Sequence, residues 1–346
     1  MNLYSSIKES LKQNPSTWLI TGVAGFIGSN LLEALLKLNQ RVIGLDDFST
    51  GTQYNLQEVS RKLPNEFSRK FTLIEGDICS EKDCIQSVEG VDYILHHAAV
   101  ASVPLSFEFP EQTHAINVTG FLNILNAARK AKVKKIVYAS SSAVYGNSSI
   151  PKKRETDCIN PMSPYAVSKH VNELYAKNFE ICYGLPSIGL RYFNIFGPRQ
   201  NPHGPYAAVI PLWIDAMVNN RHMYINGDGN NIRDFCYIED VVQANILAAL
   251  SSSLGDTVYN VGCGEGTTLN ELLQMLKMII CPERINLTYR DFRQGDIKIS
   301  EADISYANTK LGFIPTTTLS EGLKLVIDSC QSIPGTITEK IIAADA

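Results

Sequence analysis

The sequence has no long hydrophobic run, and no segment approaches the ~20 consecutive apolar residues that a membrane-spanning helix needs. The first fifteen residues also lack the charged region followed by an apolar core that marks a secretory signal. Lysine and arginine form no stripe that would attract nucleic acid or an anionic membrane, and the formal net charge is only −4. We therefore expect a cytoplasmic protein whose partner is a small molecule, with no nucleic-acid or membrane partner.

Metal-binding patterns are also missing. The eight cysteines are scattered without a CxxC motif or a short His/Cys repeat, so we predict no metal site. Cys182 and Cys236 lie in apolar runs, where free cysteine usually serves as a small core residue. Because no secretory signal is present, we expect no disulfide bonds.

What the chain does have is 45% apolar residues over 346 positions, enough for a sizeable core. Short β-rich runs alternate with segments of helical periodicity through the first two thirds of the sequence. This alternation predicts an α/β protein with a doubly wound parallel sheet covered by helices on both faces. The predicted strands are residues 17–22, 41–46, 71–77, 91–98, 135–141 and 187–193.

The pattern becomes irregular after residue 195, where turn-rich stretches separate shorter elements. We expect a smaller C-terminal α/β lobe built onto the same sheet, with a strand at 259–264 and a helix at 269–280. Leu3, Ile7 and Leu11 share one face of an N-terminal helix that ends near Pro15. The predicted organisation is a helical extension at 1–15, a nucleotide-binding domain at 16–195, and a substrate-binding lobe at 196–346 in which 235–265 returns to the sheet.

The segment GVAGFIGS places Gly22, Gly25 and Gly28 between a predicted strand and a predicted helix. Glycines at this point let the backbone turn sharply and leave the helix N-terminus free to face a pyrophosphate, as in the Rossmann-type fold. The second strand ends at Asp46, about twenty residues later, where a carboxylate accepts hydrogen bonds from an adenosine ribose and repels a 2′-phosphate. NAD is therefore the expected cofactor rather than NADP. Asp77, at the end of the third strand, is a further candidate for contact with the adenine.

Tyr165 and Lys169 are four residues apart, and so share one face of a helix that begins near Pro164. Tyr4/Lys8 and Tyr306/Lys310 have the same spacing, but neither pair follows a serine-rich strand end such as SSSAVYG. A free tyrosine is about one part in a thousand ionised at pH 7, and lowering its pKa by ~3 units takes roughly 4 kcal/mol. We hypothesise that Lys169 and an oxidised nicotinamide supply this, which makes Tyr165 a general base for a sugar hydroxyl.

Taken together, these segments resemble the extended short-chain dehydrogenase/reductase family, and within it the nucleotide-sugar 4-epimerases. The likeness spans nearly the whole chain. The matching segments are GVAGFIGS, HHAAVASVPLS, SSSAVYG, SPYAVSKHVNE, RYFNIFGPRQ, NGDGNNIRDFCYIEDV and FRQGDI. The resemblance is strongest to UDP-N-acetylhexosamine 4-epimerases of surface-polysaccharide pathways, some of which act on the corresponding uronic acids.

The resemblance implies a role for each matching position. It implies that the catalytic residues are Ser141, Tyr165 and Lys169. It implies that the cofactor is bound by Gly22, Gly25, Phe26, Ile27, Gly28, Asp46, Asp47, Phe48, Asp77, Ile78, Ala98, Ala99, Val100, Tyr165, Lys169 and Tyr192. It implies that the substrate is bound by Ser102, Val103, Ser141, Ser142, Asn194, Val209, Tyr224, Arg233, Arg293, Asp296 and Ser300. Arg233 has an alternative partner in the neighbouring Asp234.

Two positions refine the reaction. The family's dehydratases carry an Asp-Glu pair just before the position of Tyr145, and its decarboxylases carry a glutamate there, whereas this chain has Ser142 and Ala143. Only transfer of a hydride out and back is then supported, which favours an epimerase. At position 300 the family associates a tyrosine with hexoses that lack an acetamido group. Ser300 leaves room for an N-acetyl group.

The expected function is reversible C4 epimerisation of UDP-N-acetylglucosamine and UDP-N-acetylgalactosamine through a 4-keto intermediate, with NAD held by the enzyme. The same reaction on a UDP-N-acetylhexosaminuronic acid is an alternative, as is another NAD-dependent nucleotide-sugar oxidoreductase. A nucleotide-binding protein without redox activity is the rival from another class. The resemblance also implies a homodimer through helices near 113–131 and 165–182.

Overall fold

The computed structural model describes residues 3–64, 69–203, 207–252, 255, 258–282, 284–292 and 297–331. Through residue 141 its elements are α1 (Leu3–Gln13), β1 (Thr17–Thr21), α2 (Phe26–Lys37), β2 (Arg41–Asp46), α3 (Gln53–Lys62), β3 (Phe71–Glu75), α5 (Glu81–Ser87), β4 (Tyr93–His96), α6 (Val103–Glu108), α7 (Pro110–His114), the π-helical segment η1 (Ala115–Gly120), α8 (Phe121–Ala131) and β5 (Lys135–Ser141). The following elements are the 3₁₀ turn η2 (Ser142–Tyr145), β6 (Lys152–Lys153), α9 (Pro164–Tyr183), β7 (Ser187–Tyr192), β8 (Asn194–Phe196), α10 (Val209–Val218), β9 (Met223–Asn226), β10 (Ile232–Tyr237), α11 (Ile238–Leu250), β11 (Val258–Val261), β12 (Gly266–Thr268), α12 (Leu269–Ile280), β13 (Leu287–Arg290), β14 (Ile299–Ala302), α13 (Ser305–Leu311) and α14 (Leu319–Gln331).

The large sheet has seven strands in the order β11-β7-β5-β4-β1-β2-β3, all parallel. The predicted doubly wound parallel sheet is therefore confirmed. The chain runs outward from β1 through β2 to β3, then crosses to β4 on the other side of β1. Sheets of this kind bind ligands at the carboxyl ends of the strands where the order reverses, which here is the crevice between β1 and β4.

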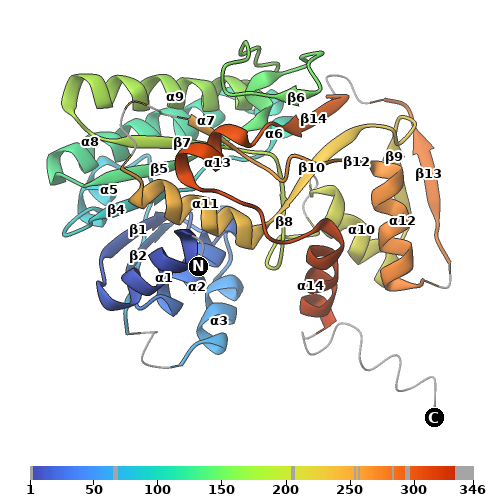
Figure 1. The fold of residues 1–346 in the computed structure, drawn as a ribbon, viewed down its shortest axis with the longest axis horizontal. Helices are drawn as coiled ribbons and strands as arrows, with labels where there is room; N and C mark the ends of the chain where they lie inside the picture. The colour runs from blue at the N-terminus through green and yellow to red at the C-terminus, as the bar shows by residue number, and fades with distance from the viewer. Residues whose placement is uncertain are drawn as a thin grey trace.

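Helices cover both faces of this sheet (Figure 1). Helices α5, α8 and α9 pack together on one face, while α2, α3 and α11 lie on the other. Trp18, Leu19 and Ile20 of β1 have no exposed surface, and all six residues of β7 are buried. A strand covered on both sides is mostly apolar, and a buried polar residue in it needs a partner, which explains the hydrophobic runs in the sequence.

The C-terminal part of the chain adds a smaller lobe beside the large sheet (Figure 1). Strand β10 is at its centre and pairs with β8 and β14 in parallel and with β12 antiparallel. Strands β9 and β13 form a separate two-stranded ribbon. After β10 the chain returns to the nucleotide-binding part, because α11 packs against α2 and β11 forms the edge of the large sheet beside β7.

Helix α1 is attached to the large domain by Gln40, whose side chain has no exposed surface. Its amide Nε2 donates to the backbone oxygen of Leu11 at 2.7 Å, and its Oε1 accepts hydrogen bonds from Ser16 N at 2.9 Å and Trp18 Nε1 at 3.1 Å. Leu11, the buried residue of α1, belongs to the same apolar cluster as Trp18. The turn between α2 and β2 therefore fixes both the end of α1 and the start of β1.

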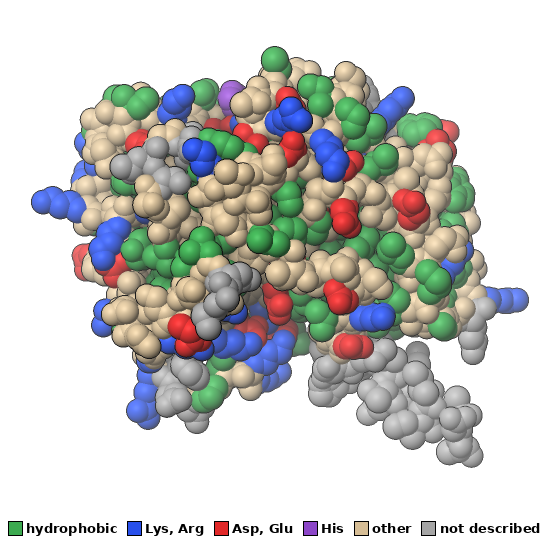
Figure 2. Space-filling model, in the orientation of Figure 1, with side chains coloured by type: hydrophobic (Ala, Val, Ile, Leu, Met, Phe, Trp, Pro, Cys, Tyr) green, Lys and Arg blue, Asp and Glu red, His purple; other side chains and the backbone are tan. Residues whose placement is uncertain are grey.

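Acidic and basic side chains are interspersed over the molecular face in Figure 2, without a stripe of one sign. Among the helices that the structure describes, none has the length and apolar content required to cross a membrane.

Candidate active site

The glycine turn brings three chain segments into close contact. Gly22 has φ +71°, and a Cβ atom there would lie 2.8 Å from Ala98 N, just beyond β4. A Cβ atom on Gly28 would lie 2.0 Å from the Gly22 oxygen. Gly25 precedes α2 without a side-chain cap, so the N–H groups at Phe26 and Ile27 begin a helix whose N-terminus is open to an anion. The turn therefore fits the pyrophosphate of a dinucleotide.

Asp46 ends β2 and is buried beside this turn. Its Oδ2 accepts a hydrogen bond from Ala24 N at 2.8 Å, and its Oδ1 accepts one from Phe48 N at 2.9 Å. Burial raises the pKa of Asp46, although both backbone hydrogen bonds act against this. The carboxylate thus supports the glycine turn, and each oxygen keeps capacity to accept a further hydrogen bond, as the predicted ribose contact requires. Asp47 beside it is exposed and accepts hydrogen bonds from Ser49.

The other predicted cofactor residues lie at the same edge of the sheet. Asp77 and Ile78 follow β3, residues 98–100 follow β4, and Tyr192 ends β7. Asp77 is exposed and accepts a hydrogen bond from Cys79 N at 2.8 Å, whereas Ile78 is buried. The Tyr192 hydroxyl accepts a hydrogen bond from Asn245 at 2.8 Å. With the glycine turn after β1 and Asp46 at the end of β2, the predicted cofactor residues thus lie at the carboxyl ends of β3, β2, β1, β4 and β7, all on the same edge of the sheet.

Asn117 is a site residue that the sequence reading did not identify. Its side chain accepts a hydrogen bond from Val100 N at 2.8 Å and donates to Val100 O at 3.0 Å and to Ser168 Oγ at 3.0 Å. Asn117 lies in the π-helical segment η1, and such segments often occur at functional sites. It ties the predicted cofactor loop to α9, but the surrounding helical pattern offers no sequence signal for this role.

The structure brings Ser141 and Tyr165 together. Ser141 is the last residue of β5, and Tyr165 is the second residue of α9, whose start at Pro164 is capped by Ser163 through a hydrogen bond from Ala166 N at 3.1 Å. The Ser141 and Tyr165 hydroxyls are hydrogen-bonded to each other. Lys169 is buried one helical turn further on, with Nζ 5.8 Å from the centroid of the Tyr165 ring.

Burial dominates the electrostatics of Tyr165 and Lys169. Burial raises the pKa of Tyr165, and the hydrogen bond with Ser141 only partly opposes it. Lys169 Nζ donates to the backbone oxygen of Ala139 at 2.9 Å, and burial lowers its pKa to about 8. Desolvation therefore dominates at both groups in the protein without NAD, and the combined effect of Lys169 and an oxidised nicotinamide on the pKa of Tyr165 stays a prediction.

A buried polar network connects α9, which carries Tyr165, with β7 and with the chain on either side of Ser141. Glu173 on α9 pairs with Arg191 on β7 through two contacts of 2.9 and 2.7 Å, and it accepts a hydrogen bond from Ser140 Oγ at 2.6 Å. Arg191 Nη1 also donates to the Tyr145 hydroxyl at 2.8 Å, and that hydroxyl donates to Asn260 at 2.7 Å. Ser140 and Tyr145 bracket Ser141 in the chain. The network therefore fixes Ser141 relative to the helix that carries Tyr165.

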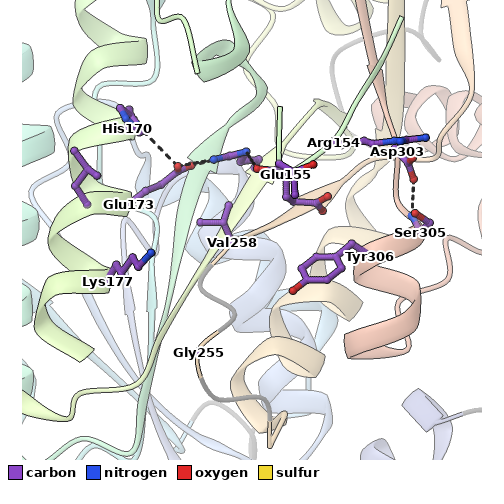
Figure 3. Close-up of a pocket in the computed structure, with 13 residues that line it drawn as sticks. Arg154, Glu155, His170, Glu173, Lys177, Gly255, Val258, Asp303, Ser305 and Tyr306 are labelled. Carbon is purple, nitrogen blue, oxygen red and sulfur yellow. Dashed lines mark hydrogen bonds and ion pairs between the residues drawn. The ribbon is translucent and has the colours of Figure 1, made fainter. Parts of the chain in front are cut away.

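A cavity of about 570 Å³ lies on the other side of this network. Figure 3 shows Glu173 extending from α9 between His170 and Glu155, with Tyr306 across the cavity. His170 and Lys177 follow Tyr165 by 5 and 12 positions, which places them about 140° and about 120° around α9 from it. The cavity is therefore separate from the crevice at β1 and β4.

The predicted substrate residues are spread over the crevice and the smaller lobe. Ser102 caps α6 by accepting a hydrogen bond from Leu105 N at 3.2 Å, and the next residue, Val103, is 36% exposed. Ser142 begins η2, Asn194 begins β8 and Val209 begins α10. Asn194 Nδ2 donates to Asp234 O at 3.2 Å.

Tyr224 lies further out, on β9. It alternates with the buried Met223 and Ile225, so its side chain faces away from the core, and the Arg290 guanidinium lies 3.1 Å from its ring centroid. Arg293 and Asp296 lie outside the described residues.

Arg233 and Asp234 are consecutive in β10, so their side chains leave opposite faces of the strand. The Asp234 carboxylate accepts hydrogen bonds from Cys263 N at 2.7 Å, Gly264 N at 2.9 Å and Ala302 N at 3.1 Å. Burial raises the pKa of Asp234 to about 6. Asp234 thus joins β10 to residues 263–264 and to β14, while Arg233, on the other face of the strand, donates from Nη1 to Ile232 O at 2.9 Å.

No cluster of three or more potential metal-ligating side chains occurs among the described residues. The geometry offers instead a dinucleotide crevice with a Ser-Tyr-Lys group at its edge. This arrangement suits removal and return of a proton next to a bound redox cofactor.

Comparisons with known proteins agree with this geometry. Residues 18–262 match the model of the NAD dependent epimerase/dehydratase family. A putative UDP-glucose 4-epimerase of Methanocaldococcus jannaschii is 38% identical over 313 residues, which cover 90% of this chain and 97% of that protein.

Two solved structures are also similar. A UDP-N-acetylglucosamine 4-epimerase from Methanobrevibacter ruminantium, in complex with UDP-N-acetylmuramic acid, is 37% identical with a TM-score of 0.85, covering 92% of this chain and 99% of that one. A UDP-glucuronic acid 4-epimerase from Bacillus cereus, in complex with UDP-glucuronic acid and NAD, is 31% identical with a TM-score of 0.82, covering 90% and 98%. The glycine turn, the Ser-Tyr-Lys group and these matches show that the chain belongs to the NAD dependent epimerase/dehydratase family.

Proposed function

We propose that this protein is a 4-epimerase that interconverts UDP-N-acetylglucosamine and UDP-N-acetylgalactosamine. The observation that carries the reaction type is the hydrogen bond between Ser141 and Tyr165, with Lys169 one turn away, at the edge of the dinucleotide crevice. Similar proteins named as UDP-sugar 4-epimerases support this assignment. Bound NAD supplies a hydride acceptor that also returns the hydride, and its positive charge favours an ionised Tyr165.

In this proposal Tyr165 takes the proton from the sugar C4 hydroxyl, while Ser141 holds the same oxygen in place. The C4–H bond breaks with its electron pair and leaves a 4-keto sugar. That sugar turns about its diphosphate linkage, and Tyr165 then returns the proton to the C4 oxygen as hydride is delivered to the other face. Lys169 keeps the helix face in register through its hydrogen bond to Ala139 O. No net oxidation results.

Ser142 and Ala143 favour epimerisation over the dehydration and decarboxylation reactions that other members of the family carry out. They occupy the first two positions of η2, directly after Ser141, where no carboxylate is available for a further proton transfer. Without an acid at either position, the 4-keto sugar has no group to remove water or carbon dioxide from it.

Ser300 supports an N-acetylated substrate. It is buried in β14 beside Arg233, and a small side chain leaves space that a tyrosine would fill. The corresponding uronic acid is a second candidate, since the Bacillus cereus relative is named as a UDP-glucuronic acid 4-epimerase. Residues 196–346, including Arg293 and Asp296, are proposed to bind the UDP part.

A homodimer through α9 also belongs to this proposal. Val167, Leu174 and Ile181 are 47%, 56% and 72% exposed and recur at intervals of seven residues along the helix. Apolar residues at that interval form one stripe suited to helix packing. Light scattering during size-exclusion chromatography tests this: a monomer mass at micromolar concentration would contradict it.

The decisive experiment incubates the purified protein, without added NAD, with UDP-glucose, UDP-N-acetylglucosamine or UDP-N-acetylglucosaminuronic acid. The proposal expects the C4 epimer from UDP-N-acetylglucosamine. An epimer from the uronic acid alone would move the assignment to that substrate. Consumption of added NAD in proportion to product would indicate a dehydrogenase instead.

A further inference from the structure

Loop 197–203 connects β8 with the chain leading to α10, and it carries one fully buried cation. The Arg199 side chain has no exposed surface, and its backbone φ is +68°. A non-glycine residue in the left-handed region is uncommon and costs conformational energy. Something in the surroundings of Arg199 must therefore hold both its backbone and its charge.

The first set of contacts comes from α2. Arg199 Nε donates to Ser29 Oγ at 3.0 Å, and Nη2 donates to Asn30 Oδ1 at 2.6 Å. Asn30 Nδ2 in turn donates to Pro198 O at 3.1 Å and to Phe26 O at 2.8 Å. The loop is thus bound to the first two turns of the helix that follows the glycine turn.

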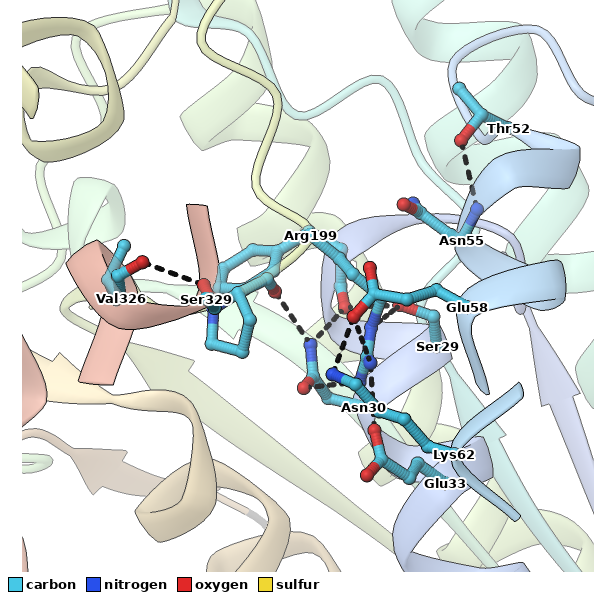
Figure 4. A network of polar contacts seen from close by, with 12 residues as sticks. Ser29, Asn30, Glu33, Thr52, Asn55, Glu58, Lys62, Arg199, Val326 and Ser329 are labelled. Atoms are coloured by element: carbon cyan, nitrogen blue, oxygen red, sulfur yellow. Dashed lines mark hydrogen bonds and ion pairs between the residues drawn. The ribbon is translucent and has the colours of Figure 1, made fainter. Parts of the chain in front are cut away.

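The second set consists of two glutamates that share the guanidinium (Figure 4). Arg199 Nη1 lies 2.7 Å from Glu33 Oε2 on α2 and 3.6 Å from Glu58 Oε1 on α3. Each glutamate also pairs with a lysine one turn further along its own helix, Lys37 at 2.6 Å and Lys62 at 2.5 Å. Burial alone would raise the pKa of Glu33, but the hydrogen bond from Lys37 and the charge of Arg199 hold it below its ordinary value.

A buried charge network of this kind contributes little to the stability of the folded protein. Removing charges from water offsets most of what their attraction provides, and apolar residues of similar size often serve stability equally well. The planar, fork-shaped guanidinium does fix orientation, since it holds contacts on three sides at once. The network is therefore suited to holding loop 197–203 in one orientation relative to α2 and α3.

The geometry that it sets connects the two halves of the proposed site. Asn194 and Val209, two proposed substrate residues, stand on either side of loop 197–203 in the chain. Ser29 and Asn30 lie on the helix whose N-terminus faces the proposed pyrophosphate position. We propose that Arg199 is a positioning residue, which holds loop 197–203 against α2 and so keeps the UDP-binding residues at a fixed place relative to the cofactor. This inference rests on the proposed function.

The test compares Arg199→Met and Arg199→Lys with the wild type, each purified with its NAD. Binding of UDP is measured by calorimetry, bound NAD by absorbance after denaturation, and kcat and KM by product analysis. Arg199→Met is expected to weaken UDP binding and to raise KM by about tenfold. Bound NAD is expected to stay at the wild-type level, because the glycine turn rests on β1 and Asp46 rather than on the loop. Lysine keeps the positive charge but not the forked guanidinium. The UDP affinity and KM of Arg199→Lys should therefore lie between those of the wild type and Arg199→Met.

Lys37→Met and Lys62→Met are the matched controls, because they remove the exposed partners of the same two glutamates while leaving Arg199 in place. Both should bind UDP as the wild type does. Unchanged UDP binding by Arg199→Met, or loss of NAD in step with UDP affinity, would overturn the positioning role. If Arg199→Met does not fold, Arg199→Lys decides the same comparison. Failure of the wild type itself to bind UDP would overturn the proposed function, and this inference with it.

Discussion

Arg233 and Ser300 lie opposite each other on the neighbouring parallel strands β10 and β14. Ser300 is buried, with only 7% of its surface exposed. Adjacent strands are about 4.8 Å apart, which places a larger side chain at position 300 in contact with Arg233. If the sugar binds beside Arg233 as proposed, the residue at position 300 limits the room for its C2 substituent.

Ser300→Tyr is accordingly expected to reduce kcat/KM for UDP-N-acetylglucosamine by at least about tenfold, while UDP-glucose is affected less. Ser300→Ala, which adds no volume, serves as the control and should keep the wild-type preference. Competition between the two substrates in one reaction measures the ratio directly. Equal losses on both sugars would show that position 300 does not face the C2 substituent.

Tyr165→Phe removes the hydroxyl that is hydrogen-bonded to Ser141 and leaves the ring in place. If Tyr165 is the general base, turnover should fall by about 10²- to 10⁴-fold while bound NAD is retained. Tyr306→Phe is a matched control, because Lys310 lies 5.8 Å from its ring centroid, the same distance as in the Tyr165 pair. Near-normal turnover by Tyr165→Phe would reject the assignment.

Lys169 should give activity and stability opposite responses to alkaline pH. Burial lowers its folded-state pKa to about 8, against 10.5 ordinarily, so between these values the unfolded chain holds the extra proton. The Lys169 contribution to the free energy of unfolding therefore rises from pH 8 to 10.5, by about 3 kcal/mol at most. Activity should fall over the same range, as the ammonium group is lost.

Denaturant titrations and kcat measurements at several pH values, on the wild type and Lys169→Met, check both trends. The stability difference between the two proteins should change across this range. A wild-type rate that stays flat up to pH 10 would contradict the role given to the charged form of Lys169.

Glu173→Gln removes the anionic partner of Arg191 and leaves a buried cation. Breaking a buried ion pair from one side typically costs about 3–5 kcal/mol of unfolding free energy. Glu9→Gln in the exposed pair with Lys12 is the comparison, and there a change within about 0.5 kcal/mol is expected. Urea unfolding at neutral pH measures both. Similar small losses for the two variants would mean that solvent reaches Arg191.

The edge of the large sheet could be predicted from the sequence because each strand there is a short apolar run followed by a polar or small residue. Asp46 and Ser141 end strands as predicted. The strand predicted at 91–98 is shorter in the structure, since β4 ends at His96 and Ala98 turns to contact Gly22. The conformation of the glycine turn decides that boundary, and hydrophobic periodicity contains no information about it.

The buried polar pairs could not be predicted in the same way. Glu173 and Arg191 are 18 positions apart, and Ser29 and Arg199 are 170 apart. Periodicity shows which face of a helix is buried, but not which polar groups meet there. Arg199 also lies in a stretch rich in glycine and proline, which indicates a solvent-exposed loop rather than a buried charge. The lowered pKa of Lys169 could not be predicted for a related reason, because desolvation depends on packing that only the folded chain shows.

Gln40 makes helix α1 part of the packed structure of the nucleotide-binding domain. A chain shortened to start at Pro15 would deprive a fully buried amide of its acceptor on Leu11 and remove Leu11 from the apolar cluster. Melting temperature should then drop even though every residue of the crevice remains. Recombinant forms of the protein therefore need to keep their first helix, however remote from the chemistry it lies.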